Sequence, residues 1–196
     1  MQTLSNFHDF ILCIISTLEA RDSYTSHHSS RVAEMTEKIC DLLNLPLDEK
    51  EVYHIAAHLH DVGKIGIRDS VLLKEGKLSQ EEWEIMKSHA IQGYNILKNV
   101  KSFEEVAKIV RSHHERFDGK GYPDGLKGEE IPRLVRIISV ADAYDAMTSK
   151  RSYRDVLAQE IVKEEIEKGK GKQFDPQIAD VMLLLMAEDT NYKMHE

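Results

Sequence analysis

Apolar residues recur at intervals of three and four positions along most of this chain, the spacing that places them on one face of a helix. The repeat is clear in two early segments, 4–18 and 32–42. The alternation of apolar and polar residues that is typical of strands is nearly absent. The pattern therefore predicts an all-α fold, a single helical domain without internal repeats or a long linker.

Three later helices are marked by a capping residue that is followed three positions on by glutamate, the capping-box pattern. Their predicted ranges are Asp48 to the stretch 56–66, Ser79 to about Lys98, and Ser102 to about His114. The apolar segment 131–147 predicts a buried helix. Asp175 followed by Pro176 predicts the start of a last helix, because proline is favoured at the first helical position.

Glycines and prolines interrupt the helical pattern at 116–132, so this segment is either an ordered functional loop or a surface connector.

The length and the net charge of the chain limit the classes of function that it can have. A chain of 196 residues with a net charge of −8 can form one domain with a real core, but it lacks the basic surface that nonspecific DNA or RNA binding needs. The longest apolar runs, 11–15 and 181–187, are too short to span a membrane, so we expect a soluble cytoplasmic protein. Cys13 and Cys40 fall in helical apolar patterns, which indicates reduced core thiols. We expect one domain over 1–196, with its core at about 20–187 and no separate sensory domain.

The stretch 56–66 carries the most specific chemistry. It combines His60, Asp61 and Lys64 at a point where an apolar helix stops at Gly63. Adjacent helical residues project about 100° apart, so His60 and Asp61 can reach one cation only near a helix end that faces a cleft. The two oxygens of Asp61 could also bridge two cations. A hydrolytic centre built on hard cations follows as a hypothesis, against the alternative of a solvated helix end with a chance His-Asp pair.

Other candidate ligands are spread along the chain: His28, His89, His113, His114 and Asp142. Taken singly, such residues are more often structural. Asp142 lies in an apolar helix, where a carboxylate is costly to bury without a counter-charge. Together with His60 and Asp61, these residues could nearly fill the coordination of two cations. His54 and His58 also stand four apart like a zinc pair, but no third ligand is evident near them, and His8 and His27 are left out of the candidate site.

The segments His60 to Lys64 (HDVGK) and Gly121 to Pro123 (GYP) together resemble the HD-GYP family, bacterial phosphodiesterases of cyclic di-GMP within the HD metal-dependent phosphohydrolases. The similarity extends over nearly the whole chain, in motifs at 22–32, 60–67, 86–89, 113–126, 141–151 and 174–176. It implies a single HD-type helical domain with an ordered GYP loop.

The resemblance implies two divalent metal ions, iron or manganese being the usual occupants. It assigns His28, His60, Asp61 and Asp142 to one ion and Asp61, His89, His113 and His114 to the other. Some family members hold a third metal with a glutamate at the position where this chain has Tyr24, so two metals are expected here.

The implied reaction is in-line attack on a phosphodiester by a metal-bridging hydroxide. Lys64 would hold a phosphate oxygen, and Asp22 would orient Lys64 or take up a proton. Arg151 and Arg154 match positions that contact substrate phosphate, their alternative being a solvated helix start. Tyr122 would stack on a base or contact a phosphate of the substrate. The structural alternative is that its side chain holds the loop against the domain.

Three functions remain open. The chain could hydrolyse cyclic di-GMP to the linear dinucleotide, to GMP or to both; it could hydrolyse a hybrid cyclic dinucleotide instead. It could also be a module that does not catalyse a reaction. Such a module would either sense the nucleotide by binding it or dock onto a diguanylate cyclase (GGDEF) partner through the GYP loop. A second copy of the chain is a further candidate partner, through the N-terminal helix.

Overall fold

The computed structural model describes residues 2–21, 27–149 and 156–189, and these residues form helices and loops without a named strand. The all-α fold expected from the sequence is therefore confirmed. The α-helices are α1 (Gln2–Arg21), α2 (His28–Leu42), α3 (Leu47–Leu59), α4 (Asp69–Leu72), α5 (Gln80–Lys87), α6 (His89–Leu97), α7 (Glu104–Ser112), α8 (Arg133–Thr148), α9 (Gln159–Gly169) and α10 (Pro176–Glu188). Short 3-10 helices are η2 (Val62–Gly66), η3 (Lys101–Phe103) and η4 (Gly128–Glu130).

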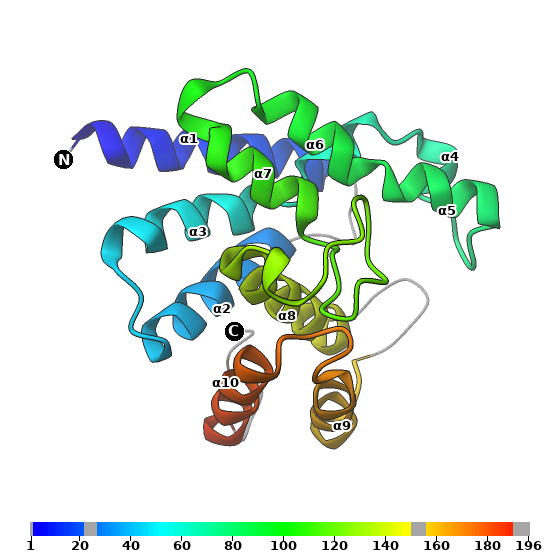
Figure 1. The fold of residues 1–196 in the computed structure, drawn as a ribbon. Coiled ribbons are helices and arrows are strands. Elements are labelled where there is room, and N and C mark those ends of the chain that lie inside the picture. The colour runs from blue at the N-terminus through cyan, green and yellow to red at the C-terminus, as the bar shows by residue number, and fades with distance from the viewer. Residues whose placement is uncertain (1, 22–26, 150–155, 190–196) are drawn as a thin grey trace.

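The helices are arranged around α2, α3 and α8 (Figure 1). Helices α1, α6 and α7 lie on one side of this centre, and α9 and α10 lie on the other. Helix α2 packs against both α3 and α8, while α6 packs against α7 and η2. In α8, Ile137, Ile138 and Ala141 are completely buried, because this helix has neighbours around most of its circumference. The centre of the core therefore lies directly beneath the segments that carry the candidate ligands.

Two of the predicted helix starts are confirmed by their side-chain hydrogen bonds. The Glu82 N–H donates to Ser79 Oγ at 3.2 Å, and the Ser79 N–H donates to Glu82 Oε2 at 2.7 Å, which completes a capping box. Asp175 accepts from the N–H groups of the next turn, with Pro176 at the first helical position. These caps are contacts between near neighbours, which is why a local pattern can indicate them.

Two other predicted starts are wrong. Helix α3 begins at Leu47, with Pro46 at the N-cap position, so Asp48 lies inside the helix. Ser102 lies inside η3, and α7 begins only at Glu104. A short capping pattern arises readily by chance on a charged surface, and neighbouring backbone geometry then decides where the helix starts.

The helix predicted from Ser79 to about Lys98 is broken at Ser88 into α5 and α6. The Ser88 hydroxyl donates to the Ile85 carbonyl at 2.6 Å, a back-bond that loosens helical pairing. The break makes His89 the first residue of α6. The sequence analysis also missed α9, whose buried apolar face is only Val162 and Ile166. Of the two cysteines, Cys40 is buried as expected, but Cys13 is exposed.

None of the described helices combines the length and the hydropathy that crossing a lipid bilayer requires.

Gly63 serves close packing rather than helix termination. It is not among the glycines with positive φ, and α3 already ends at Leu59, with His60 as its C-cap in right-handed geometry. A Cβ at Gly63 would lie 1.9 Å from the His89 carbonyl oxygen and 2.4 Å from the Gly93 nitrogen. Only glycine therefore lets η2 approach the backbone of α6. The interpretation of Gly63 as the residue that stops the helix is wrong for this reason.

Replacing Gly63 by alanine should destabilise the fold by about 3 kcal/mol, because backbone atoms of α6 would have to move apart. The matched control is Gly66→Ala in the same 3-10 helix, where a Cβ would meet only the Gln92 side chain. That control should cost less than about 1 kcal/mol, since a flexible side chain can move away. Urea unfolding of both variants would measure the difference, and equal stabilities would contradict the packing argument.

Candidate metal centre

Asp61 lies at the junction of α3 and η2, and its two carboxylate oxygens face two different groups of imidazoles. Its Oδ2 lies 3.4 Å from His60 Nε2 and 3.7 Å from His28 Nε2. Its Oδ1 lies 3.4 Å from His89 Nε2 and 3.9 Å from His113 Nε2. A single carboxylate thus stands between two sets of nitrogen donors.

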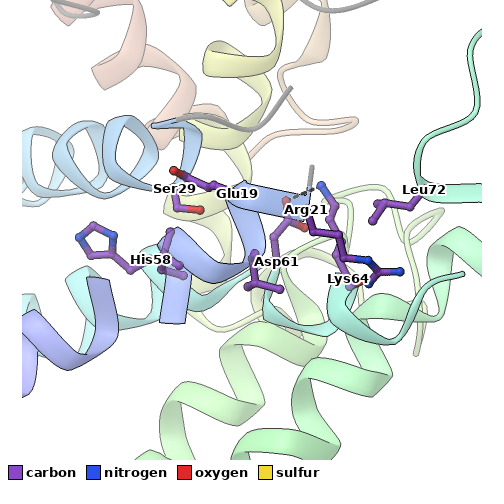
Figure 2. Close-up of a pocket in the computed structure, with 9 residues that line it drawn as sticks. Glu19, Arg21, Ser29, His58, Asp61, Lys64 and Leu72 are labelled. Atoms are coloured by element: carbon purple, nitrogen blue, oxygen red, sulfur yellow. Dashed lines mark hydrogen bonds and ion pairs between the residues drawn. The ribbon is translucent and has the colours of Figure 1, made fainter. Parts of the chain in front are cut away.

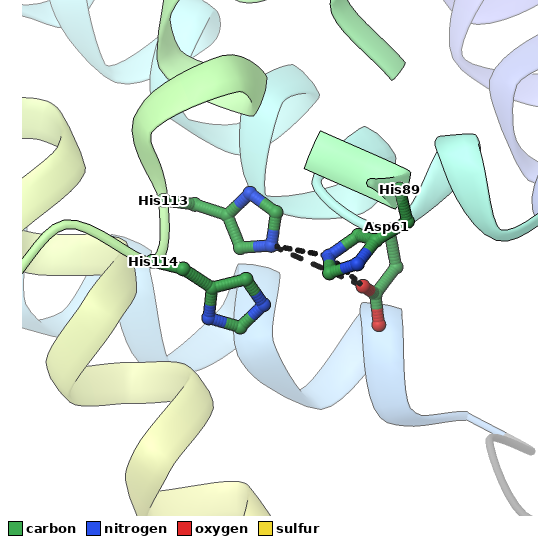
Figure 3. Close-up of side chains that lie close together, drawn as sticks. All are labelled: Asp61, His89, His113 and His114. Atoms are coloured by element: carbon green, nitrogen blue, oxygen red, sulfur yellow. Dashed lines mark hydrogen bonds and ion pairs between the residues drawn. The ribbon is translucent and has the colours of Figure 1, made fainter. Parts of the chain in front are cut away.

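The structure brings every predicted metal ligand into one of two groups. In each group, the candidate ligand atoms all lie within 4.8 Å of one another. Figure 3 shows the first group: Asp61 just before η2, His89 at the start of α6, and His113 and His114 just after α7. The second group comprises His28, His60 and Asp142. Because His28 Nε2 lies 3.7 Å from Asp61 Oδ2, the same carboxylate also borders this second group.

The imidazoles are oriented by hydrogen bonds on the side away from Asp61. In three of them the Nδ1 atom bonds the backbone carbonyl three residues earlier, and because a carbonyl can only accept, Nδ1 must carry the proton. Each Nε2 is then directed at the site, which is how metal-binding histidines are usually oriented. These bonds join His60 to Ala57 at 2.7 Å, His89 to Met86 at 2.7 Å and His113 to Val110 at 2.6 Å.

Burial keeps one group of imidazoles neutral. It lowers the pKa of His89 and, helped by the neighbouring histidines, lowers the pKa of His113 further and that of His114 to about 3. Neutral imidazole is the form that binds a cation. Without soft sulfur ligands, this donor set of nitrogen and carboxylate oxygen fits a first-row divalent cation.

His60 and Asp61 instead form a charged pair in the absence of a cation. Burial acts to lower the pKa of His60, but the Asp61 carboxylate raises it to about 9. Burial acts to raise the pKa of Asp61, but Lys64 and His60 hold it well below its usual value. A divalent cation would displace the proton from His60, so it would take over a charge interaction that the site already provides.

Asp145 and Arg31 support His28, and the sequence analysis did not identify either of them as a site residue. Asp145 is buried and accepts a 2.7 Å hydrogen bond from His28 Nδ1 and a 2.6 Å bond from Arg31 Nε. Burial acts to raise the pKa of Asp145, but these two bonds lower it below its usual value. Arg31 and Asp145 each follow a candidate ligand, His28 and Asp142, by three positions on the same helix. That spacing was the signal available in the sequence.

The glycine-rich segment is an ordered loop that is attached to the candidate site. Glu115 is buried, and its Oε1 accepts hydrogen bonds from the N–H groups of Asp124 at 2.7 Å and Gly125 at 3.0 Å. A Cβ at Gly121 would lie 2.4 Å from the Arg116 nitrogen and 2.6 Å from the His114 oxygen. Glycine at 121 therefore lets the loop pack directly against the end of α7.

A cleft of about 810 Å³ opens above the ligand groups. Its lining includes His28, Lys64, Trp83, His89, His114 and Tyr122. The Tyr122 ring lies 4.8 Å from the His114 ring and 6.4 Å from the Trp83 ring, measured between centroids. Tyr122 thus both holds the loop against the site and lines the cleft, while Trp83 is 44% exposed. A cleft of this size can enclose a dinucleotide-sized ligand.

The C-terminal end of α1 lies next to Asp61 and Lys64, and the three line one small cavity (Figure 2). Lys64 Nζ lies 2.6 Å from Asp61 Oδ2, and Figure 2 shows Arg21 beside Lys64. The Arg21 guanidinium donates to the backbone oxygens of Lys64 at 3.2 Å and Ile65 at 2.7 Å, and it pairs with Asp69. Arg21 therefore holds η2, the short helix that carries Lys64.

Four residues named in the sequence analysis lie outside the described residues: Asp22, Tyr24, Arg151 and Arg154.

Comparison with known proteins finds one matching family profile and several similar curated proteins. The HD domain family profile matches residues 13–178. The chain is 40% identical over 177 residues to the 3'3'-cGAMP-specific phosphodiesterase 2 of Vibrio cholerae, covering 89% of this chain and 34% of that protein. It is 39% identical over 198 residues to a cyclic di-GMP phosphodiesterase of Thermotoga maritima, covering 98% of this chain and 54% of that protein. The chain thus spans about a third to a half of the length of these relatives.

Solved structures with a similar fold are known as well. A crystal structure of the Vibrio cholerae cyclic GMP-AMP phosphodiesterase V-cGAP3 matches with a TM-score of 0.70 at 20% identity, covering 95% of this chain and 49% of that one. The HD domain of the Listeria monocytogenes phosphodiesterase PgpH matches with a TM-score of 0.65 at 19% identity, covering 91% and 97%. At these identities the likeness concerns the fold. From its profile match, its curated relatives and its two motifs, the chain belongs to the HD domain family, in the HD-GYP group.

Proposed function

We propose that this chain is a metal-dependent phosphodiesterase of cyclic dinucleotides, with cyclic di-GMP as its first candidate substrate. The observation that carries the proposal is the position of Asp61, whose two oxygens face two groups of nitrogen and oxygen donors. His28, His89 and His114 of these groups line the cleft. The names of the relatives support the substrate class, because both cyclic di-GMP and 3'3'-cGAMP phosphodiesterases are among them.

The residues present fit two divalent cations. Iron or manganese is our proposal for their identity, taken from the resemblance to the HD-GYP family; imidazole and carboxylate donors suit these ions, as they also suit zinc. Bound there, the cations would supply a water of lowered pKa and neutralise charge on the phosphoryl oxygens. The proposed ligands are His28, His60, Asp61 and Asp142 for one cation and Asp61, His89, His113 and His114 for the other.

The chain's own residues would bind and orient the substrate. Lys64 lines the cleft with its ammonium group next to Asp61, where it would bind a phosphate oxygen that does not take part in the cleaved bond. Trp83 and Tyr122 offer aromatic faces on the cleft wall for the nucleotide bases. The chain has a ligand residue at every position that the family resemblance implies, which favours catalysis over a role as a nucleotide sensor without turnover.

The proposal is tested by purifying the protein without oxygen, measuring its metal content and incubating it separately with cyclic di-GMP and 3'3'-cGAMP. Chromatography of the products would distinguish the linear dinucleotide, from one cleavage, and mononucleotides, from two. Faster hydrolysis of 3'3'-cGAMP would assign the hybrid nucleotide as substrate. Tight binding of both nucleotides without hydrolysis by the metal-loaded protein would contradict catalysis and favour the sensor.

The variant Asp61→Ala should lose both turnover and the metal of the candidate centre, because it removes the carboxylate whose two oxygens face the two ligand groups. Metal content measured by elemental analysis and hydrolysis measured by chromatography would check this. The matched control is Asp180→Ala, an exposed aspartate on α10 that should leave both quantities unchanged. Full activity in Asp61→Ala would refute the proposed site.

The variant Asp145→Ala should weaken metal binding by about 10- to 100-fold, because His28 would lose the acceptor that orients its ring. The affected cation is the one held by the His28 group. Competition titration against a chromophoric chelator would measure the dissociation constant, with circular dichroism to confirm that the variant is folded. Asp145→Asn keeps an acceptor for His28 and should lose less affinity. Unchanged affinity in the folded alanine variant would show that Asp145 does not support the site.

Replacing Trp83 by alanine should raise KM about 5- to 150-fold, the equivalent of one lost base–aromatic stack, with kcat and metal content nearly unchanged. Trp83→Phe keeps an aromatic face and should retain most of the affinity. Steady-state kinetics of the three proteins would measure the split between KM and kcat. An unchanged KM in Trp83→Ala would exclude a stacking role for this residue.

A further inference from the structure

A third group of imidazoles lies apart from the candidate metal centre, between α1 and α3. It consists of His8 on α1 and of His54 and His58, one turn apart on α3, with ligand nitrogens all within 4.8 Å of one another. His54 Nε2 lies 3.0 Å from His8 Nε2 and 3.2 Å from His58 Nε2. The sequence analysis found no third ligand near His54 and His58. That expectation is wrong, because the fold brings His8 to them from 46 positions away.

Hydrogen bonding alone leaves this group incompletely satisfied. An imidazole nitrogen carries either one proton or one lone pair in the ring plane, so His54 Nε2 can bond only one of its two neighbours. His58 is 3% exposed, and the neighbour of its Nε2 is His54 Nε2 at 3.2 Å. A cation placed among the three Nε2 atoms would instead engage all of them at once.

The spacing of the nitrogens suits a tetrahedral cation. With zinc–nitrogen bonds of about 2.0–2.1 Å, two nitrogens on one zinc ion are separated by about 3.3 Å. The His54 separations of 3.0 and 3.2 Å are close to that value, and the ligand atoms of His8 and His58 lie within 4.8 Å of each other. Three histidines would leave one coordination position for water or an anion, a common arrangement for zinc.

The site is open to a cation from solution. His8 and His54 line a surface groove of about 340 Å³, whose walls also include Glu37, Glu51 and Lys50. The two carboxylates favour a cation in the groove, and the Lys50 ammonium is paired with Asp41. A hydrated ion can therefore reach the imidazoles without opening the core.

We propose that His8, His54 and His58 bind one borderline divalent cation of the zinc class, which fastens α1 onto α3. Helix α1 contacts both α3 and η2, and its last residue, Arg21, holds the backbone of η2, which carries Lys64. The cation would thus stabilise the docking of a helix whose other end supports the cleft. This site shares no ligand with the candidate metal centre, so the proposal stands independently of the proposed function.

Zinc stoichiometry tests the site directly. Metal-free wild-type protein, His8→Ala and His54→Gln would be titrated with zinc against a chromophoric chelator. Both variants should bind one equivalent less than the wild type. The matched control, Asp9→Asn, changes the exposed neighbour of His8 and should retain the wild-type stoichiometry. Equal zinc uptake by the wild type and both histidine variants would overturn the proposal.

Amide hydrogen exchange tests, separately from catalysis, whether the cation fastens α1 onto α3. At zinc 100-fold above its Kd, exchange of α1 amides that requires undocking should slow about 100-fold in the wild type. The effect should persist in Asp61→Ala, which keeps the three histidines but lacks the bridging carboxylate, and it should vanish in His8→Ala. Protection of α1 that is lost in Asp61→Ala and retained in His8→Ala would assign the effect to the other centre and refute the fastening of α1 by this cation.

Discussion

The structure depends on one costly arrangement, a largely buried carboxylate that faces two groups of imidazoles. Burial of Asp61 is unfavourable by itself, and the protein offsets that cost with the positive charges of His60 and Lys64. The imidazoles around it approach from the starts of α2 and α6 and from the ends of α3 and α7. Helix ends thus supply the imidazoles, whereas Asp142 reaches the same site from within α8.

Close backbone contact makes this convergence possible. Gly63 brings η2 against the start of α6, and Gly121 brings the loop against the end of α7. In both places a Cβ would overlap backbone atoms, which cannot move aside as a side chain can. The glycines of the two motifs thus belong to the same structural requirement as the ligands, since they set the distance between the segments that carry them.

Hydrogen bonds between the ligands and their own helices prepare the site before any cation binds. Three imidazoles are held by carbonyls within the same turn, whereas His28 depends on Asp145 from another helix. The first kind of support is local, and the second requires α2 and α8 to be packed together. The position of His28 therefore reports on the assembly of the core, and the docking of α1 adds a similar dependence for Lys64 through Arg21.

The sequence by itself determined the helical class, the caps at Ser79 and Asp175 and, through its motifs, the set of candidate ligands. These features rest on residue spacing or on neighbours within one turn, where local chemistry dominates. Only the tertiary structure decided the packing role of Gly63, the support of His28 by Asp145 and the meeting of His8 with His54. Each depends on how the folded chain brings segments together in space, and contacts between segments distant in sequence leave no regular pattern along the chain.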